Sequence, residues 1–148
     1  MDIYERLIQD HGKQKGLMGG IADTVGASDE RRRLFRELKQ ELEAHANAEE
    51  QTLYAAMISE PDAQEKARHS IVEHDEMNDM IAELEDSDMS EGAWIAKFKQ
   101  LRDRVVHHVD EEEDEVFARA RKVISQSKAE ALAAAFEKRK AAETKTAG

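Results

Sequence analysis

Apolar residues recur along most of this chain at the spacing of one helical face. In the stretch before residue 117, Phe98, Leu101, Val105 and Val116 share a face when each residue advances by about 100°. The same periodicity predicts four long helices and a short fifth one, over residues 2–25, 28–58, 61–84, 91–124 and 128–142. Long helices joined by short loops predict an all-α, antiparallel up-down-up-down four-helix bundle.

Turn residues set the expected helix ends. Ser28 and Ser90 are suited to cap the second and fourth helices, and Pro61 suits the first turn of the third. Ser125-Gln-Ser127 interrupts the last pattern, after which Leu132 and Phe136 should anchor the fifth helix. We therefore expect the bundle to occupy residues 1–125, and a short C-terminal helix with a tail frayed from residue 144 to occupy 126–148.

Two histidine–glutamate pairs fall on apolar faces. His45 and Glu49 lie one helical turn apart, as do His108 and Glu112, and each pair lies in the middle of the face that should be buried. A buried carboxylate is costly unless it is paired or bound to a metal. These four residues are therefore predicted to have a charged partner or a metal ion rather than to serve only in core packing.

The two pairs belong to an internal repeat. Its offset of 63 residues carries Phe35 to Phe98, Leu38 to Leu101, Leu42 to Val105, His45 to His108 and His11 to His74. Self-similarity at a fixed period indicates a duplicated unit. Here the unit is a helix pair that carries one histidine on its first helix and His-x-x-x-Glu on its second.

Composition narrows the class of protein. The chain has 148 residues, no Cys and a formal net charge of −11, which excludes thiolate metal sites and disfavours nucleic acid or an anionic membrane surface as a partner. No apolar run is long enough to span a bilayer, and the first residues do not resemble a signal peptide. We expect a cytoplasmic protein of one domain.

Six residues then form a candidate metal site. They lie on the apolar faces of the four long helices: His11, His45, Glu49, His74, His108 and Glu112. A lone histidine on a helix is more often structural than a metal ligand. Here four histidines and two glutamates share the apolar faces, and no Arg lies on those faces to pair the carboxylates, which favours a metal centre. Six ligands suffice for two ions with the carboxylates bridging, and imidazole with carboxylate suits iron, manganese or zinc.

The remaining polar residues near this pattern have simpler interpretations. The acidic run 110–115 is mostly a solvated face, with Glu115 a weaker inward candidate. Glu50 and Glu113 follow the bridging glutamates and are expected to support the ligands from outside. Tyr4 and Tyr54 are interpreted as packing residues. The helical phase of His69 and His107 predicts that both lie on the solvent side of their helices.

The pattern Asp10-His11, His45-x-x-x-Glu49-Glu50, Glu73-His74 and His108-x-x-x-Glu112-Glu113 resembles the hemerythrin-like, or HHE cation-binding, domain over roughly residues 2–124. The resemblance implies a four-helix bundle around two non-haem iron ions, an oxo- or hydroxo-bridged pair. By analogy, Glu49 and Glu112 would bridge the irons. His11 with His45 would hold one ion, and His74 with His108 the other.

One departure bears on activity. Oxygen-carrying hemerythrins place a fifth histidine one turn after the third-helix histidine, where this chain has Asn78. They also close the fourth-helix pair with an Asp one residue later in spacing, whereas this chain uses Glu112. An open iron position disfavours reversible O2 carriage and favours reaction with O2, hydrogen peroxide or nitric oxide, in peroxide decomposition or a stress response. The alternative is a non-catalytic module that senses iron or oxygen, or a metal-stabilised bundle that binds a partner protein. Whether the protein is an enzyme stays open at this stage.

Overall fold

The computed structural model describes residues 1–147, which fold into helices without a strand. The five long helices are α1 (Ile3–Ala22), α2 (Asp29–Glu49), α4 (Gln64–Glu85), α5 (Gly92–Glu111) and α7 (Gln126–Ala147). Shorter segments extend α2 and α5: η1 (Glu50–Tyr54) and α3 (Ala55–Ile58), then η2 (Glu112–Val116) and α6 (Phe117–Val123). The all-α class predicted from the sequence is confirmed. No helix among residues 1–147 is long and apolar enough to cross a membrane.

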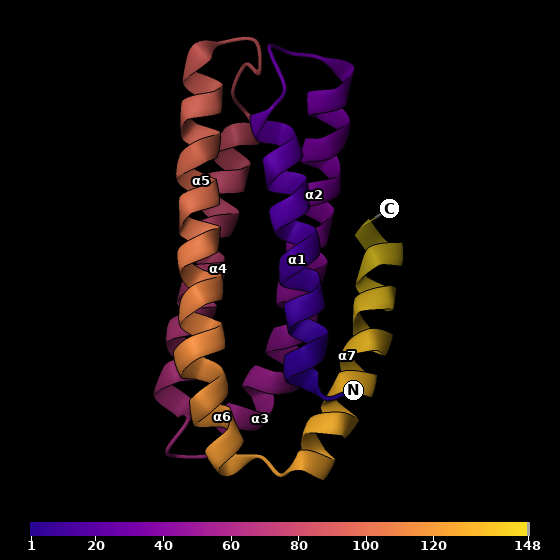
Figure 1. Ribbon diagram of the computed structural model, residues 1–148, viewed down its shortest axis with the longest axis vertical. Helices are drawn as coiled ribbons and strands as arrows, with labels where there is room; N and C mark the ends of the chain where they lie inside the picture. The colour runs from indigo at the N-terminus through magenta and orange to yellow at the C-terminus, as the bar shows by residue number, and fades with distance from the viewer. Residues whose placement is uncertain (148) are drawn as a thin grey trace.

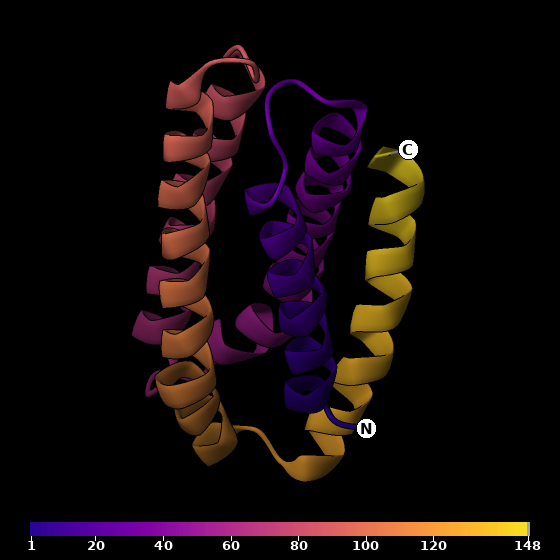
Figure 2. The same cartoon turned by 45° about the horizontal axis from the view of Figure 1, so that its top comes forward.

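The chain reverses direction at each loop, so that α1, α2, α4 and α5 lie side by side (Figure 1). The helix α7 packs on the outside of α1 and α2. Viewed after rotation, α7 stands on one side of the molecule and α5 on the other (Figure 2). One face of the bundle is therefore covered by α7, and the α4–α5 face is not.

Helix starts follow local capping chemistry. The side chain of Asp2 accepts a hydrogen bond from the Glu5 amide, and the Glu5 carboxylate accepts one from the Asp2 amide, which forms a capping box. Ser28 caps α2 as predicted, through its hydroxyl and the Arg31 amide at 3.1 Å. The prediction for Ser90 is wrong, because its hydroxyl donates to Asp88 and the cap position of α5 is Glu91.

Predicted limits of three helices are also wrong. Helix α1 ends at Ala22 instead of residue 25, since the Thr24 hydroxyl bonds to the Ile21 carbonyl and Gly26 adopts φ 62°, a left-handed turn. Pro61 lies in a turn before α4. Helix α7 starts earlier and runs further than 128–142, with the Ser125 hydroxyl accepting from the Lys128 amide. Of the tail expected to fray, residues 144–147 are helical and Gly148 lies outside the described residues.

The apolar core consists of two clusters with a polar layer between them. The first gathers Leu7, Leu53 and Phe117 with their neighbours, and the second gathers Met18, Phe35, Trp94 and others. On α1 the single inward histidine lies between members of the two clusters, and the other long bundle helices repeat this order. The duplicated sequence therefore places four histidines in one layer, roughly halfway along the bundle.

Phe136 fixes α7 to this layer. Its ring is fully buried, contacts the His45 ring edge-on at 5.7 Å between centroids, and lies under the guanidinium of Arg6 at 5.1 Å. The predicted anchor role of Phe136 and of the buried Leu132 is thus confirmed. The fifth helix is part of the wall of the polar layer, not an appendage.

Phe136→Ala should lower the free energy of unfolding by about 3–5 kcal/mol, because it leaves a cavity under α7. Urea unfolding followed by circular dichroism measures the change. Val72→Ala is the matched control, since Val72 is 54% exposed and should change stability by less than about 0.5 kcal/mol. A loss for Phe136→Ala no larger than that of the control would show that α7 is not docked through this ring.

Candidate metal centre

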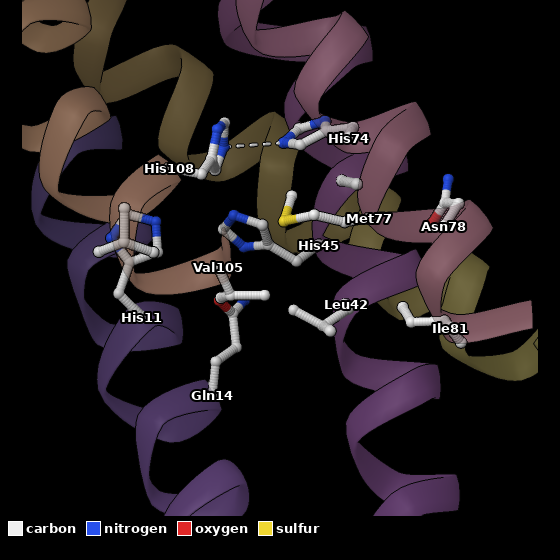
Figure 3. Close-up of a pocket in the computed structure, with 12 residues that line it drawn as sticks. His11, Gln14, Leu42, His45, His74, Met77, Asn78, Ile81, Val105 and His108 are labelled. Atoms are coloured by element: carbon white, nitrogen blue, oxygen red, sulfur yellow. Dashed lines mark hydrogen bonds between the residues drawn. The ribbon is translucent and has the colours of Figure 1, made fainter. Parts of the chain in front are cut away.

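The structure brings all six predicted residues together in the polar layer. Glu49 and Glu112 have no exposed surface, and the four histidines are at most 5% exposed. Each histidine comes from a different helix of the bundle, α1, α2, α4 or α5. Figure 3 shows the four imidazoles turned toward a common centre.

The Nε2 atoms of the histidines face the two glutamates. The separations from carboxylate oxygens are 3.1 Å for His11 to Glu112, 3.5 Å for His45 to Glu49, 3.3 Å for His74 to Glu49 and 3.7 Å for His108 to Glu112. Two compact groups result, His11 with His45 and Glu112, and His74 with His108 and Glu49, each with its donor atoms within 4.8 Å of one another. The histidine pairs are those that the resemblance implied.

The other ring nitrogen of each histidine is held by an outer carboxylate. The Nδ1 contacts are His11 to Glu113 at 2.6 Å, His45 to Asp10 at 2.8 Å, His74 to Glu50 at 2.9 Å and His108 to Glu73 at 2.7 Å. A carboxylate at Nδ1 fixes the tautomer and the ring orientation, which leaves Nε2 as the inward donor. Glu50 and Glu113 lie where the sequence predicted. Asp10 and Glu73 complete the set.

The glutamates have buried oxygen atoms without hydrogen-bond partners. Both carboxylate oxygens of Glu49 and Oε1 of Glu112 are in this state. In addition, the Nε2 atoms of His74 and His108 lie 3.2 Å apart. This contact is unfavourable when neither nitrogen carries a proton. A cation placed between these atoms would relieve both features, so the donor set fits a metal.

The pKa values of two of the histidines reflect the negative charge of the surrounding carboxylates. Burial alone would lower the pKa of His45, but Glu49 and Asp10 raise it to about 10. Burial likewise opposes charge on His74, yet the neighbouring carboxylates of Glu49 and Glu50 raise its pKa to about 9. The surrounding carboxylates therefore make this layer a site for positive charge, which protons supply when no metal does.

A wider helical turn begins directly after Glu49 in one helix and at Glu112 in the other. Helix α2 changes to π geometry at Glu50, and α5 changes at Glu112. Consecutive residues then reach the same layer, with Glu112 facing the centre and Glu113 holding His11. Single π turns inside α-helices are frequent at functional sites.

Tyr54 has a role that the sequence interpretation missed. Its hydroxyl, fully buried, donates a hydrogen bond to Oε2 of Glu112. Burial and the charges of Glu112 and Glu49 raise the pKa of this phenol well above its usual value. The packing interpretation of Tyr54 was therefore incomplete. No sequence signal identified it, because its counterpart in the repeat is Phe117.

Other inferences about α1 have mixed outcomes. Tyr4 is buried against Phe117 as expected, with its hydroxyl lacking a hydrogen-bond partner. The helical phase of Lys15, about 40° from that of His11, would place it near the core face, but its side chain is exposed. Gln14 is buried in its place and donates to Glu41 at 3.1 Å.

Cations from α7 and α1 support the outer carboxylate Asp10. The Lys140 ammonium lies 2.9 Å from Asp10 and 2.7 Å from Glu41, and Arg6 lies 2.6 Å from Asp10. Burial would raise the pKa of Asp10, but hydrogen bonds with His45, Arg6 and Lys140 hold it below its usual value. The chain of contacts from Lys140 through Asp10 to His45 connects α7 to the centre.

A small cavity of about 20 Å³ adjoins the four histidines. The rest of its lining is mainly apolar, including Leu42, Met77 and Val105. Asn78 also borders it, but Figure 3 shows the Met77 thioether extending toward the histidines and the Asn78 amide lying farther out. The position next to the imidazoles thus suits a molecule of very few atoms.

Metal-free protein should lose stability as pH rises from about 6.5 to about 10. The raised pKa values of His45 and His74 mean that the folded state holds protons that the unfolded state has released, so unfolding becomes more favourable with rising pH. Urea unfolding of chelator-treated protein at pH 6.5 and 9.5 measures this. Metal-loaded protein is the control and should show a smaller loss. Equal stability of the metal-free protein at both pH values would contradict the predicted proton binding.

Comparison with known proteins agrees with this geometry. Residues 2–120 match the family model described as the hemerythrin HHE cation-binding domain. The solved structure of a hemerythrin HHE cation-binding domain-containing protein from Mycobacterium kansasii superimposes with a TM-score of 0.88 at 25% identity, covering 99% of this chain and 89% of that one. A curated relative from Nostoc sp., named DNA nickase, is 30% identical over 140 residues. This match covers 93% of the chain but only 38% of the relative.

Proposed function

The chain belongs to the hemerythrin HHE cation-binding family, and we propose that its buried centre holds two iron ions that react with O2, hydrogen peroxide or nitric oxide. The observation that carries the proposal is the layer of buried carboxylate oxygens without hydrogen-bond partners, faced by imidazoles whose outer nitrogens are already held. Bound iron would supply a redox-active cation with affinity for small ligands.

The residues have distinct tasks in this proposal. His11 and His45 would hold one ion, and His74 and His108 the other. Glu49 and Glu112 would lie between them, which fits the position of each carboxylate between histidines of both pairs. The outer carboxylates keep each Nε2 directed inward, and the apolar clusters on both sides exclude bulk water.

The small cavity favours a ligand of very few atoms. Asn78 supplies no imidazole at the position where oxygen carriers have a fifth histidine, so one ion would have one protein ligand fewer and would be open to a small molecule. This favours peroxide decomposition or a role in stress response over reversible O2 carriage. No side chain is assigned as a catalytic acid or base.

A non-catalytic sensing role is the second candidate, and the docking of α7 favours it. Phe136 contacts the His45 ring, and Lys140 contacts the carboxylate that holds His45. A change in metal occupancy would therefore reach α7, which lies on the surface and could signal to a partner protein.

We do not extend DNA nicking to this chain. That name describes a relative of which the match covers only 38%, and a net charge of −11 is unsuited to phosphate contacts. We propose that the ligand is a small molecule and not nucleic acid or a membrane. We also propose that the protein is cytoplasmic.

His45→Ala and Glu112→Ala should each lose most bound iron, because each removes a ligand and leaves its neighbours buried without charge compensation. Inductively coupled plasma mass spectrometry after expression with ample iron measures the content. Glu115→Ala is the control, since Glu115 lies nearby but is 58% exposed on its side chain. Wild-type iron content in both ligand variants would show that the site is misplaced.

Iron-loaded protein should consume hydrogen peroxide faster than free iron at equal concentration. The reason is that the ligands would keep the iron accessible through the cavity and redox-active. An oxygen electrode or the absorbance of peroxide follows the rate, with Glu112→Ala as the matched variant expected at the background rate. Consumption no faster than free iron, with a change in α7 docking on chelation, would favour the sensing role instead.

A further inference from the structure

The two halves of the duplicated bundle treat equivalent carboxylates differently. Asp10 holds His45 in the first half, and Glu73 holds His108 in the second. On the first side, Arg6 and Lys140 neutralise Asp10 beneath α7. The second side has no such helix over it (Figure 2).

The repeat offset that carries Asp10 to Glu73 also carries Arg6 to His69. A permanent cation is thus replaced by an imidazole, which is a metal ligand when neutral. His69 is half-exposed, with 53% of its side-chain surface open. The second carboxylate therefore lacks the fixed positive charges that its counterpart has.

Three donor atoms converge on this open face. His69 Nε2 lies 3.4 Å from Oε2 of Glu73 and 3.0 Å from Oε1 of Glu111, and the three atoms lie within 4.8 Å of one another. One imidazole N–H can donate well to only one oxygen, so a single proton cannot satisfy both carboxylates. Two of the three side chains are mostly buried, at 8% and 17% exposed.

A fourth residue orients this set. His107 Nε2 lies 3.2 Å from the other oxygen of Glu111. An imidazole at that oxygen directs Oε1 toward His69, as supporting partners do around metal ligands. A groove lined by acidic residues such as Asp62 and Glu111, and by the cations Lys66 and Arg119, connects the cluster with solvent.

We propose that His69, Glu73 and Glu111 form a surface site for a divalent transition-metal cation such as Zn²⁺, with water completing its coordination. One imidazole and two carboxylates suit Zn²⁺ or Fe²⁺ and disfavour Cu(I). The ion does for Glu73 what Arg6 and Lys140 do for Asp10. Since the other oxygen of Glu73 holds His108, the surface ion is coupled to the buried centre. The site does not rest on the identity of the metal in that centre.

Equilibrium dialysis against Zn²⁺, with metal counted per folded chain, tests the site. Wild-type protein should bind one more ion than His69→Ala, whatever number the buried centre takes. Because this readout is a difference between two proteins with the same buried centre, failure of the di-iron proposal would not affect it. Circular dichroism checks that His69→Ala remains folded, as its exposure predicts.

Two further variants sharpen the result. Glu115 is an exposed carboxylate that pairs with Lys66. The Glu115→Ala variant should therefore keep the additional ion. His107→Ala should weaken its binding by about tenfold or more, as loss of a supporting partner does. Equal zinc numbers in wild type and His69→Ala, or loss of the ion in Glu115→Ala, would overturn the proposal.

Discussion

The burial of two carboxylates in the middle of a helical bundle is the constraint on which the other features depend. Glu49 and Glu112 have no contact with solvent and keep oxygen atoms without hydrogen-bond partners. Such groups are tolerated only where positive charge is close. The four imidazoles provide a place for that charge, as protons in the metal-free protein or beside a metal ion.

Around this layer the structure controls orientation from outside. A carboxylate at the Nδ1 atom of each imidazole orients the ring so that Nε2 faces the centre. Two π turns let glutamates that are adjacent in sequence reach the same layer. On one side Lys140 of α7 lies against Asp10, and on the other the equivalent carboxylate, Glu73, has His69 in place of such a cation. The bundle is thus nearly symmetric in its ligands and unequal in what surrounds them.

The sequence predicted the helices and the six central residues because both depend on short-range periodicity, and the repeat reinforced each assignment. It could not predict that Asp10 reaches His45 rather than its neighbour, or that Lys140 reaches Glu41, since those contacts depend on how distant helices pack. Tyr54 was missed because an aromatic residue on a buried face usually only packs. The last residue of α1, Ala22, and the first residue of α4, Gln64, depend on turn geometry that the apolar pattern does not contain.

The most direct measurement is the metal content of the purified protein together with its absorption spectrum in air. Two iron ions per chain, with the near-ultraviolet charge-transfer bands of a bridged pair, are the predicted result. No iron, or a single zinc ion, in protein made with ample iron would contradict the redox centre and leave a metal-stabilised bundle.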